Sequence, residues 1–149
     1  MLAQFETVPR FLATTPAQEL SDLKNEFLTA EISPKGAEIQ SIKDKNGLEV
    51  IWQGGEKCWS DHAPTLFPIV GRLLEDKYIL EGKEYEMPKH GFARKLPWSL
   101  KSITDSSAEF ILTSNEYTMG IYPYEFDFTV TYALEGNTLA VSHRITNKN

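Results

Sequence analysis

The sequence predicts an all-β fold, specifically an antiparallel β-sandwich. Two observations support this: short runs of alternating apolar and polar residues recur from Phe27 to Thr146, and turn residues separate the runs. Short strands joined by short turns pair antiparallel and pack as two layers. The 149 residues contain no internal repeat or linker. We therefore expect one sandwich domain over residues 22–149, preceded by an N-terminal arm or short helix over residues 1–21.

The N-terminal arm carries the one helix signal that the sequence offers. The stretch TTPAQELSDL, residues 14–23, has a threonine cap, a proline at the first helical position and a glutamine three residues after the threonine. We expect a turn or two of helix near Pro16 and no helix elsewhere in the chain.

The expected strands follow in chain order, and most of them are grouped as hairpins. The turn signals PKG and KNG separate the first strands, and the later hairpins turn at Gly82, at TDSS and at EGN. The runs are FLTAEIS (27–33), AEIQSIKD (37–44), LEVIWQ (48–53), DKYILEG (76–82) with KEYEMP (83–88), WSLKSI (98–103) with AEFILTS (108–114), and FDFTVTYAL (126–134) with TLAVSHRIT (138–146).

Charge and composition exclude several classes of partner. The 15 basic and 21 acidic side chains give a formal net charge of −6, which repels phosphate backbones and anionic lipids. No apolar run approaches the roughly 20 residues of a membrane helix, and the N-terminus lacks a secretory pattern. The single cysteine, Cys58, cannot form an internal disulfide. We expect a cytoplasmic protein that binds neither nucleic acid nor membrane.

His90 is the strongest candidate for chemistry among the three histidines. In MPKHGFAR, residues 87–94, it follows Pro88, precedes Gly91 and lies outside every alternating run, at the end of a hairpin. Histidine titrates near neutral pH, and glycine allows the backbone to approach a ligand closely. The segment is therefore either a site for proton transfer or simply a loop.

Two arginines strengthen the case for a site. Arg72 follows a glycine at the end of PTLFPIVGRL, residues 64–73, and Arg94 follows His90 within HGFAR. The planar guanidinium suits vicinal hydroxyls or a phosphate. A surface ion pair is the alternative for Arg72. We expect Arg72, His90 and Arg94 to lie together around one open cleft.

The remaining candidates favour structural roles. His143 is in phase with Val141 and Ile145, which indicates a histidine in the core or at its rim rather than a catalytic group. Cys58 and His62 flank Trp-Ser-Asp and could supply metal ligands or a nucleophile pair. No second pair of residues follows at ligand spacing, so we favour a surface loop and expect no metal site.

The segments FPIVGRL, HGFARKLPW and YPYEFDFTVTYALEGNTL resemble the aldose 1-epimerase (galactose mutarotase) family, and in particular its LacX-type and hexose-6-phosphate mutarotase-like branches. The resemblance runs from about LKNEFLTAEIS to ITN. It implies a β-sandwich whose concave face binds a monosaccharide or sugar phosphate, with no cofactor. It places His90 on the histidine that orients substrate, Arg72 on an arginine that contacts the sugar, and Arg94 on a contact to a hydroxyl or a phosphate.

The resemblance also implies that the chain corresponds to the N-terminal half of the family's sandwich. Interconverting α and β anomers needs an acid at the ring oxygen and a base at the anomeric hydroxyl. In the family these are a second histidine and a glutamate, both from later segments than those matched here. The function expected is therefore a mutarotase-like isomerase with doubtful catalysis. The alternative is a carbohydrate-binding module or remnant without catalysis. Uncovered sheet edges favour self-association.

Overall fold

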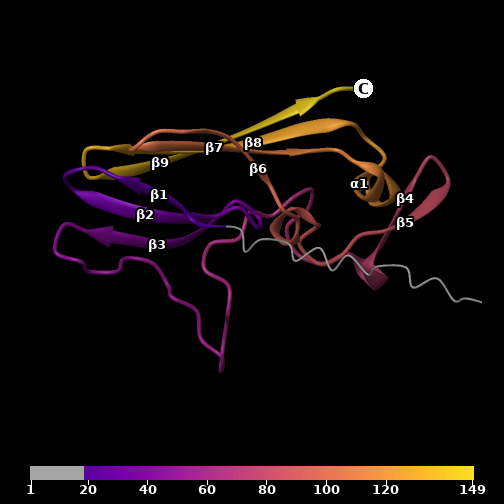
Figure 1. The fold of residues 1–149 in the computed structure, drawn as a ribbon. Helices are drawn as coiled ribbons and strands as arrows, with labels where there is room; N and C mark the ends of the chain where they lie inside the picture. The colour runs from indigo at the N-terminus through magenta and orange to yellow at the C-terminus, as the bar shows by residue number, and fades with distance from the viewer. Residues whose placement is uncertain (1–18) are drawn as a thin grey trace, which may run out of the picture.

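The computed structural model describes residues 19–149, whose main body is two packed antiparallel sheets (Figure 1). This confirms the antiparallel all-β architecture. One sheet has the order β1-β2-β3 and the other the order β6-β7-β8-β9, and every neighbouring pair is antiparallel. The strands are β1 (Ser21–Lys24), β2 (Leu28–Ser33), β3 (Glu38–Asp44), β6 (Ser99–Ile103), β7 (Ser107–Thr113), β8 (Phe126–Glu135) and β9 (Thr138–Asn147).

A smaller unit lies at one end of the sandwich (Figure 1). It contains the hairpin of β4 (Lys77–Leu80) with β5 (Lys83–Glu86), and the helix α1 (Glu116–Ile121). The Tyr78 hydroxyl of β4 donates to the carbonyl oxygen of Ile121 at 2.7 Å, which fastens the hairpin to the helix. Single 3₁₀ turns occupy Leu74–Asp76 and Ala93–Lys95.

The predicted alternation decides which side chains enter the core. Every second residue of β8 is buried, from Phe126 through Val130 to Leu134. Burying apolar side chains removes their surface from water, and these residues meet the inner faces of β2 and β3. Phe67 joins this core from outside the sheets: its ring lies 5.0 Å from those of both Phe126 and Phe128. The segment that precedes Arg72 is thereby anchored in the core.

The run at residues 48–53 is not a strand, contrary to the sequence prediction. It makes one isolated bridge, between Lys43 and Glu49. The Glu49 carboxylate then accepts from the amides of Ile42 and Ile51 at 2.8 and 3.3 Å, and from the hydroxyl of Ser41. The Ile42 amide thus donates to the Glu49 side chain, and residues 48–53 make only this one bridge to the sheet.

The helix expected near Pro16 lies outside the described residues, and residues 21–23 lie in β1, paired with β2. The expectation of no helix elsewhere is wrong. A helix that the sequence did not predict, α1, begins where the Asn115 side chain accepts from the amide of Thr118 at 3.1 Å and the Thr118 hydroxyl accepts from the amide of Asn115 at 2.8 Å.

His143 lies at the rim of the sandwich and not in its core. The register places it opposite Val130, on the inner face of the sheet, as its phase predicted. The residue is nevertheless exposed, because the β1–β3 sheet covers β8 and leaves β9 largely uncovered.

None of the helices in residues 19–149 has both the length and the apolar character needed to cross a membrane.

Candidate functional site

The two segments that carry the candidate residues, 64–73 and 87–98, lie against each other. Phe67 forms a parallel bridge with Gly91, and the amide of Phe92 donates to the Phe67 carbonyl oxygen at 2.9 Å. Gly91 has a left-handed φ of 71°, and a Cβ added there would lie 2.0 Å from that same oxygen. Only glycine permits this approach. The glycine of the His-Gly pair therefore joins the two segments.

His90 is fixed by two hydrogen bonds to Gly71. Its amide donates to the Gly71 carbonyl oxygen at 2.7 Å, and the Gly71 amide donates to its Nδ1 at 2.9 Å. Because Nδ1 accepts, the neutral ring carries its proton on Nε2. No group among residues 19–149 accepts a hydrogen bond from Nε2. The half-buried ring is therefore held as a donor that can serve a ligand oxygen.

The backbone of His90 is itself unusual. Its φ of 68° lies in the left-handed region. This region costs a residue with a side chain roughly 1–2 kcal/mol, although histidine is found there more often than most residue types. The paired hydrogen bonds to Gly71 hold it there. Such strain gathers at functional positions and supports a role for this residue beyond packing.

Arg72 follows Gly71 directly but points its guanidinium at a carboxylate. Its Nε and one terminal nitrogen donate to the two oxygens of Asp76 at 2.7 and 2.6 Å. These hydrogen bonds hold the pKa of Asp76 below its usual value and raise the pKa of Arg72. The Arg72 side chain is 66% exposed. Arg72 therefore forms a surface ion pair, the alternative that the sequence left open, with Asp76 beside the His90 loop.

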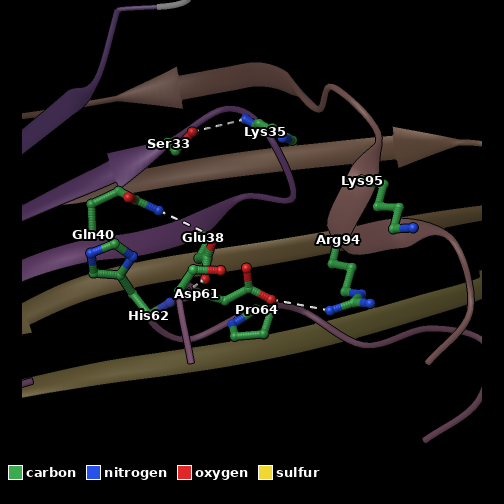
Figure 2. A pocket seen from close by; sticks show the side chains of 10 residues that line it. Ser33, Lys35, Glu38, Gln40, Asp61, His62, Pro64, Arg94 and Lys95 are labelled. Carbon is green, nitrogen blue, oxygen red and sulfur yellow. Dashed lines mark hydrogen bonds and ion pairs between the residues drawn. The ribbon is translucent and has the colours of Figure 1, made fainter. Parts of the chain in front are cut away.

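Arg94 lies in a different environment, at the wall of a polar pocket of about 520 Å³ (Figure 2). Its side chain is 22% exposed and donates to the Asp61 carboxylate at 3.1 Å. Its Nε is buried and has no partner among residues 19–149. A buried N–H group without a hydrogen-bond partner is energetically unfavourable. The Nε of Arg94 is therefore available to donate a further hydrogen bond.

The rest of this pocket is also charged and polar. Glu38 accepts from the amides of His62 and Ala63, both at 2.9 Å, and so fixes the loop that carries Asp61 (Figure 2). The lining residues are Ser33, Lys35, Glu38, Gln40, Ser60, Asp61, His62, Pro64, Arg94 and Lys95. Three permanent cations face two carboxylates that already have partners. The pocket can therefore accept hydroxyls or an anionic group.

The predicted residues thus fall into two groups. His90 is hydrogen-bonded to Gly71, the residue before Arg72, whereas neither His90 nor Arg72 lines the pocket that holds Arg94. Sequence reasoning did not find Asp61 as a partner of Arg94, since 33 residues separate them. The sequence suggested His62 only as a potential metal ligand or as the partner of Cys58 in a nucleophile pair, and it lines the same pocket.

The family model described as aldose 1-epimerase matches residues 19–149. The chain belongs to the aldose 1-epimerase family. The two motif segments, 64–73 and 87–98, both lie within the matched region, so the family covers all the candidate residues.

Relatives and solved structures of this family agree with that assignment. The plasmid-encoded protein LacX of Lactococcus lactis subsp. lactis is 36% identical over 131 residues, which are 85% of this chain and 44% of LacX. The crystal structure of a galactose mutarotase related enzyme from Lactobacillus acidophilus superposes with a TM-score of 0.85 and 41% identity. A galactose mutarotase-like protein from Lactobacillus casei ATCC 334 also gives 0.85, with 35% identity.

The chain spans less than half the length of these aldose 1-epimerase relatives. It covers 43% of the L. acidophilus structure and 45% of the L. casei structure, while 87% of this chain is matched in each case. The sandwich seen here is therefore a partial version of the galactose mutarotase-like fold, as the sequence predicted.

Proposed function

We propose that this chain binds a monosaccharide through His90 and Arg72, with Arg94 contributing a contact from the separate polar pocket, and that on its own it interconverts α and β anomers poorly. The observation that supports this best is the pair of hydrogen bonds between His90 and Gly71. They hold the neutral ring with Nε2 as a donor, which suits an oxygen of a sugar. Membership of the aldose 1-epimerase family supports the substrate class.

The chemistry of anomer exchange explains why turnover should be weak. A donor must protonate the ring oxygen while a base on the other side removes the proton of the anomeric hydroxyl. His90 can hydrogen-bond or polarise the sugar from one side and cannot serve both faces. The family resemblance assigns the acid and the base to segments after those matched here. We therefore propose weak catalysis, in an isomerase-like fold that needs no cofactor.

The substrate can carry a phosphate. Arg72 is exposed beside His90, and Arg94, Lys35 and Lys95 give the polar pocket an excess of cations. Cationic side chains favour an anionic sugar such as a hexose 6-phosphate. A second candidate function is a carbohydrate-binding module without catalysis, which the donor geometry of His90 favours equally.

A cytoplasmic location remains a prediction from composition.

Binding is tested by titrating the ¹⁵N-labelled chain with galactose, glucose and glucose 6-phosphate. We expect NMR shifts at Gly71, Arg72 and His90. His90→Ala and His90→Asn should each weaken binding about tenfold or more, because both remove the ring; asparagine also tolerates the left-handed backbone. His143→Ala removes an exposed histidine elsewhere and should leave binding unchanged. Shifts that survive both His90 variants would contradict the site.

Catalysis is tested by polarimetry of freshly dissolved α-glucose or α-galactose, and by a coupled assay for the 6-phosphate. Loss of one positioned acid or base typically lowers a rate by roughly 10²–10⁴. We expect little acceleration from the chain alone, even where the NMR titration shows binding. An acceleration that disappears in His90→Ala would show that the chain assembles its own acid and base. Binding without acceleration favours the binding-module alternative.

A further inference from the structure

The ion pair between Arg72 and Asp76 has a geometry that no other ion pair among residues 19–149 has. Nε and one terminal nitrogen of Arg72 donate to separate oxygens of the Asp76 carboxylate, at 2.7 and 2.6 Å. The other ion pairs of the described residues each use a single nitrogen. Exposed ion pairs usually contribute little, but two parallel hydrogen bonds hold a guanidinium in one orientation. Asp76 therefore sets the direction in which Arg72 points.

The backbone of Asp76 is hydrogen-bonded to both segments that carry the candidate residues. Its amide donates to the carbonyl oxygen of Leu73, the last residue of segment 64–73, at 3.1 Å. Its carbonyl oxygen accepts from the amide of Met87, the first residue of segment 87–98, at 2.7 Å. Its φ of 57° lies in the left-handed region, where strain gathers at functional positions. The fold therefore holds the carboxylate in place independently of the ion pair.

We propose that Asp76 is a specificity-determining residue, which holds Arg72 for the neutral hydroxyls of a sugar and keeps a phosphate group away from it. The N–H groups of Arg72 that Asp76 does not occupy can donate to hydroxyl oxygens. The carboxylate offsets the positive charge of Arg72 and repels an anion at the same place. This inference rests on the proposed sugar site and narrows what Arg72 accepts there. A phosphate on the same sugar then has to reach the cations of the polar pocket instead.

The substitution Asp76→Asn separates the chemistry of this side chain from its shape. The amide group of asparagine has one acceptor oxygen and an NH₂ group, so it cannot accept from both nitrogens of Arg72. It is also neutral, which leaves the full charge of Arg72 to attract an anion. Asparagine tolerates the left-handed backbone at this position, so we expect the variant to fold.

NMR titration with glucose and with glucose 6-phosphate tests the specificity of the site. We expect Asp76→Asn to tighten the binding of glucose 6-phosphate relative to that of glucose, so that the ratio of the two dissociation constants changes about tenfold. A residue that only supported the fold would weaken the binding of both sugars alike. An unchanged ratio in Asp76→Asn would therefore overturn the proposal.

Titration with inorganic phosphate tests the role of Asp76 without any sugar. The Nε–H signal of Arg72 should respond to phosphate at about tenfold lower concentration in Asp76→Asn than in the unaltered chain. Glu109→Gln is the matched control, because it removes one negative charge from the ion pair with Lys101 and should leave the Arg72 response unchanged. Equal responses in the unaltered chain and Asp76→Asn overturn the proposal, as does the same gain in Glu109→Gln. If the unaltered chain binds neither sugar, the proposed function fails, and the phosphate titration still decides the role of Asp76.

Discussion

At the scale of single residues, Gly91 shows how a motif glycine can have a structural purpose. The sequence suggested that its freedom serves a close approach of a ligand. The structure uses that freedom for the chain's own backbone, since the Phe67 carbonyl oxygen occupies the space where a Cβ would lie. The role of facing a ligand is proposed instead for the neighbouring His90, which is held by its hydrogen bonds to Gly71.

Gly91→Ala should therefore destabilise the protein through both strain and collision. A left-handed alanine costs roughly 1–2 kcal/mol, and the 2.0 Å contact with a backbone atom adds to this. We expect the free energy of unfolding in urea to fall by more than about 2 kcal/mol. Gly82→Ala is the control, because its φ is 80° but nothing lies within 4 Å of the added Cβ. Equal losses in the two variants would show that the collision is relieved without cost.

At the scale of elements, α1 shows what a pattern search misses. Six residues are too few for a helical period to emerge, so the sequence analysis found no helix there. Short helices depend instead on their caps and on tertiary contacts. Here the cap is reciprocal between Asn115 and Thr118, and the contact is the hydrogen bond from Tyr78 to the last residue of the helix.

Asn115→Ala should weaken α1 by removing the side chain that accepts from the Thr118 amide. Loss of such a cap costs about 1 kcal/mol. We expect a fall of that size in the free energy of unfolding, together with faster amide hydrogen exchange in α1. Tyr117→Ala, on an exposed position of the same helix, should change stability by less than about 0.5 kcal/mol. Unchanged exchange in α1 after Asn115→Ala would mean that packing alone maintains the helix.

At the scale of the whole molecule, Tyr132 links the two sheets. It lies on β8, and its hydroxyl donates at 2.5 Å to the carbonyl oxygen of Ala37, which immediately precedes β3. Both residues are buried. Burial raises the pKa of Tyr132 from 10.0 to about 12, because the phenolate would have to form away from water.

Tyr132 should make stability fall in alkali. The folded pKa lies above the unfolded one, so the unfolded chain loses its proton first. This contribution to stability is complete below pH 10 and is lost as the pH rises toward about 12, by roughly 2–3 kcal/mol. Urea unfolding at a series of alkaline pH values measures it.

Tyr132→Phe supplies the control for this pH dependence. It should flatten the alkaline decline, since the titrating group is gone. It should also lower stability near neutral pH by about 1–3 kcal/mol, because the Ala37 carbonyl loses its donor in a buried position. The same alkaline slope in both proteins would assign the effect to Tyr78 or Tyr122, whose pKa values burial also raises.

Local residue patterns predicted most of the strands and the two segments that carry the candidate residues. Alternation with period two and turn residues at fixed offsets are local properties, so the β8–β9 hairpin and the position of His90 outside the strands could be predicted. Only the tertiary structure decided which residues contact these elements. It set the tautomer of His90 through Gly71 and paired Arg94 with Asp61. These outcomes depend on contacts between residues far apart in the chain, which no local pattern encodes.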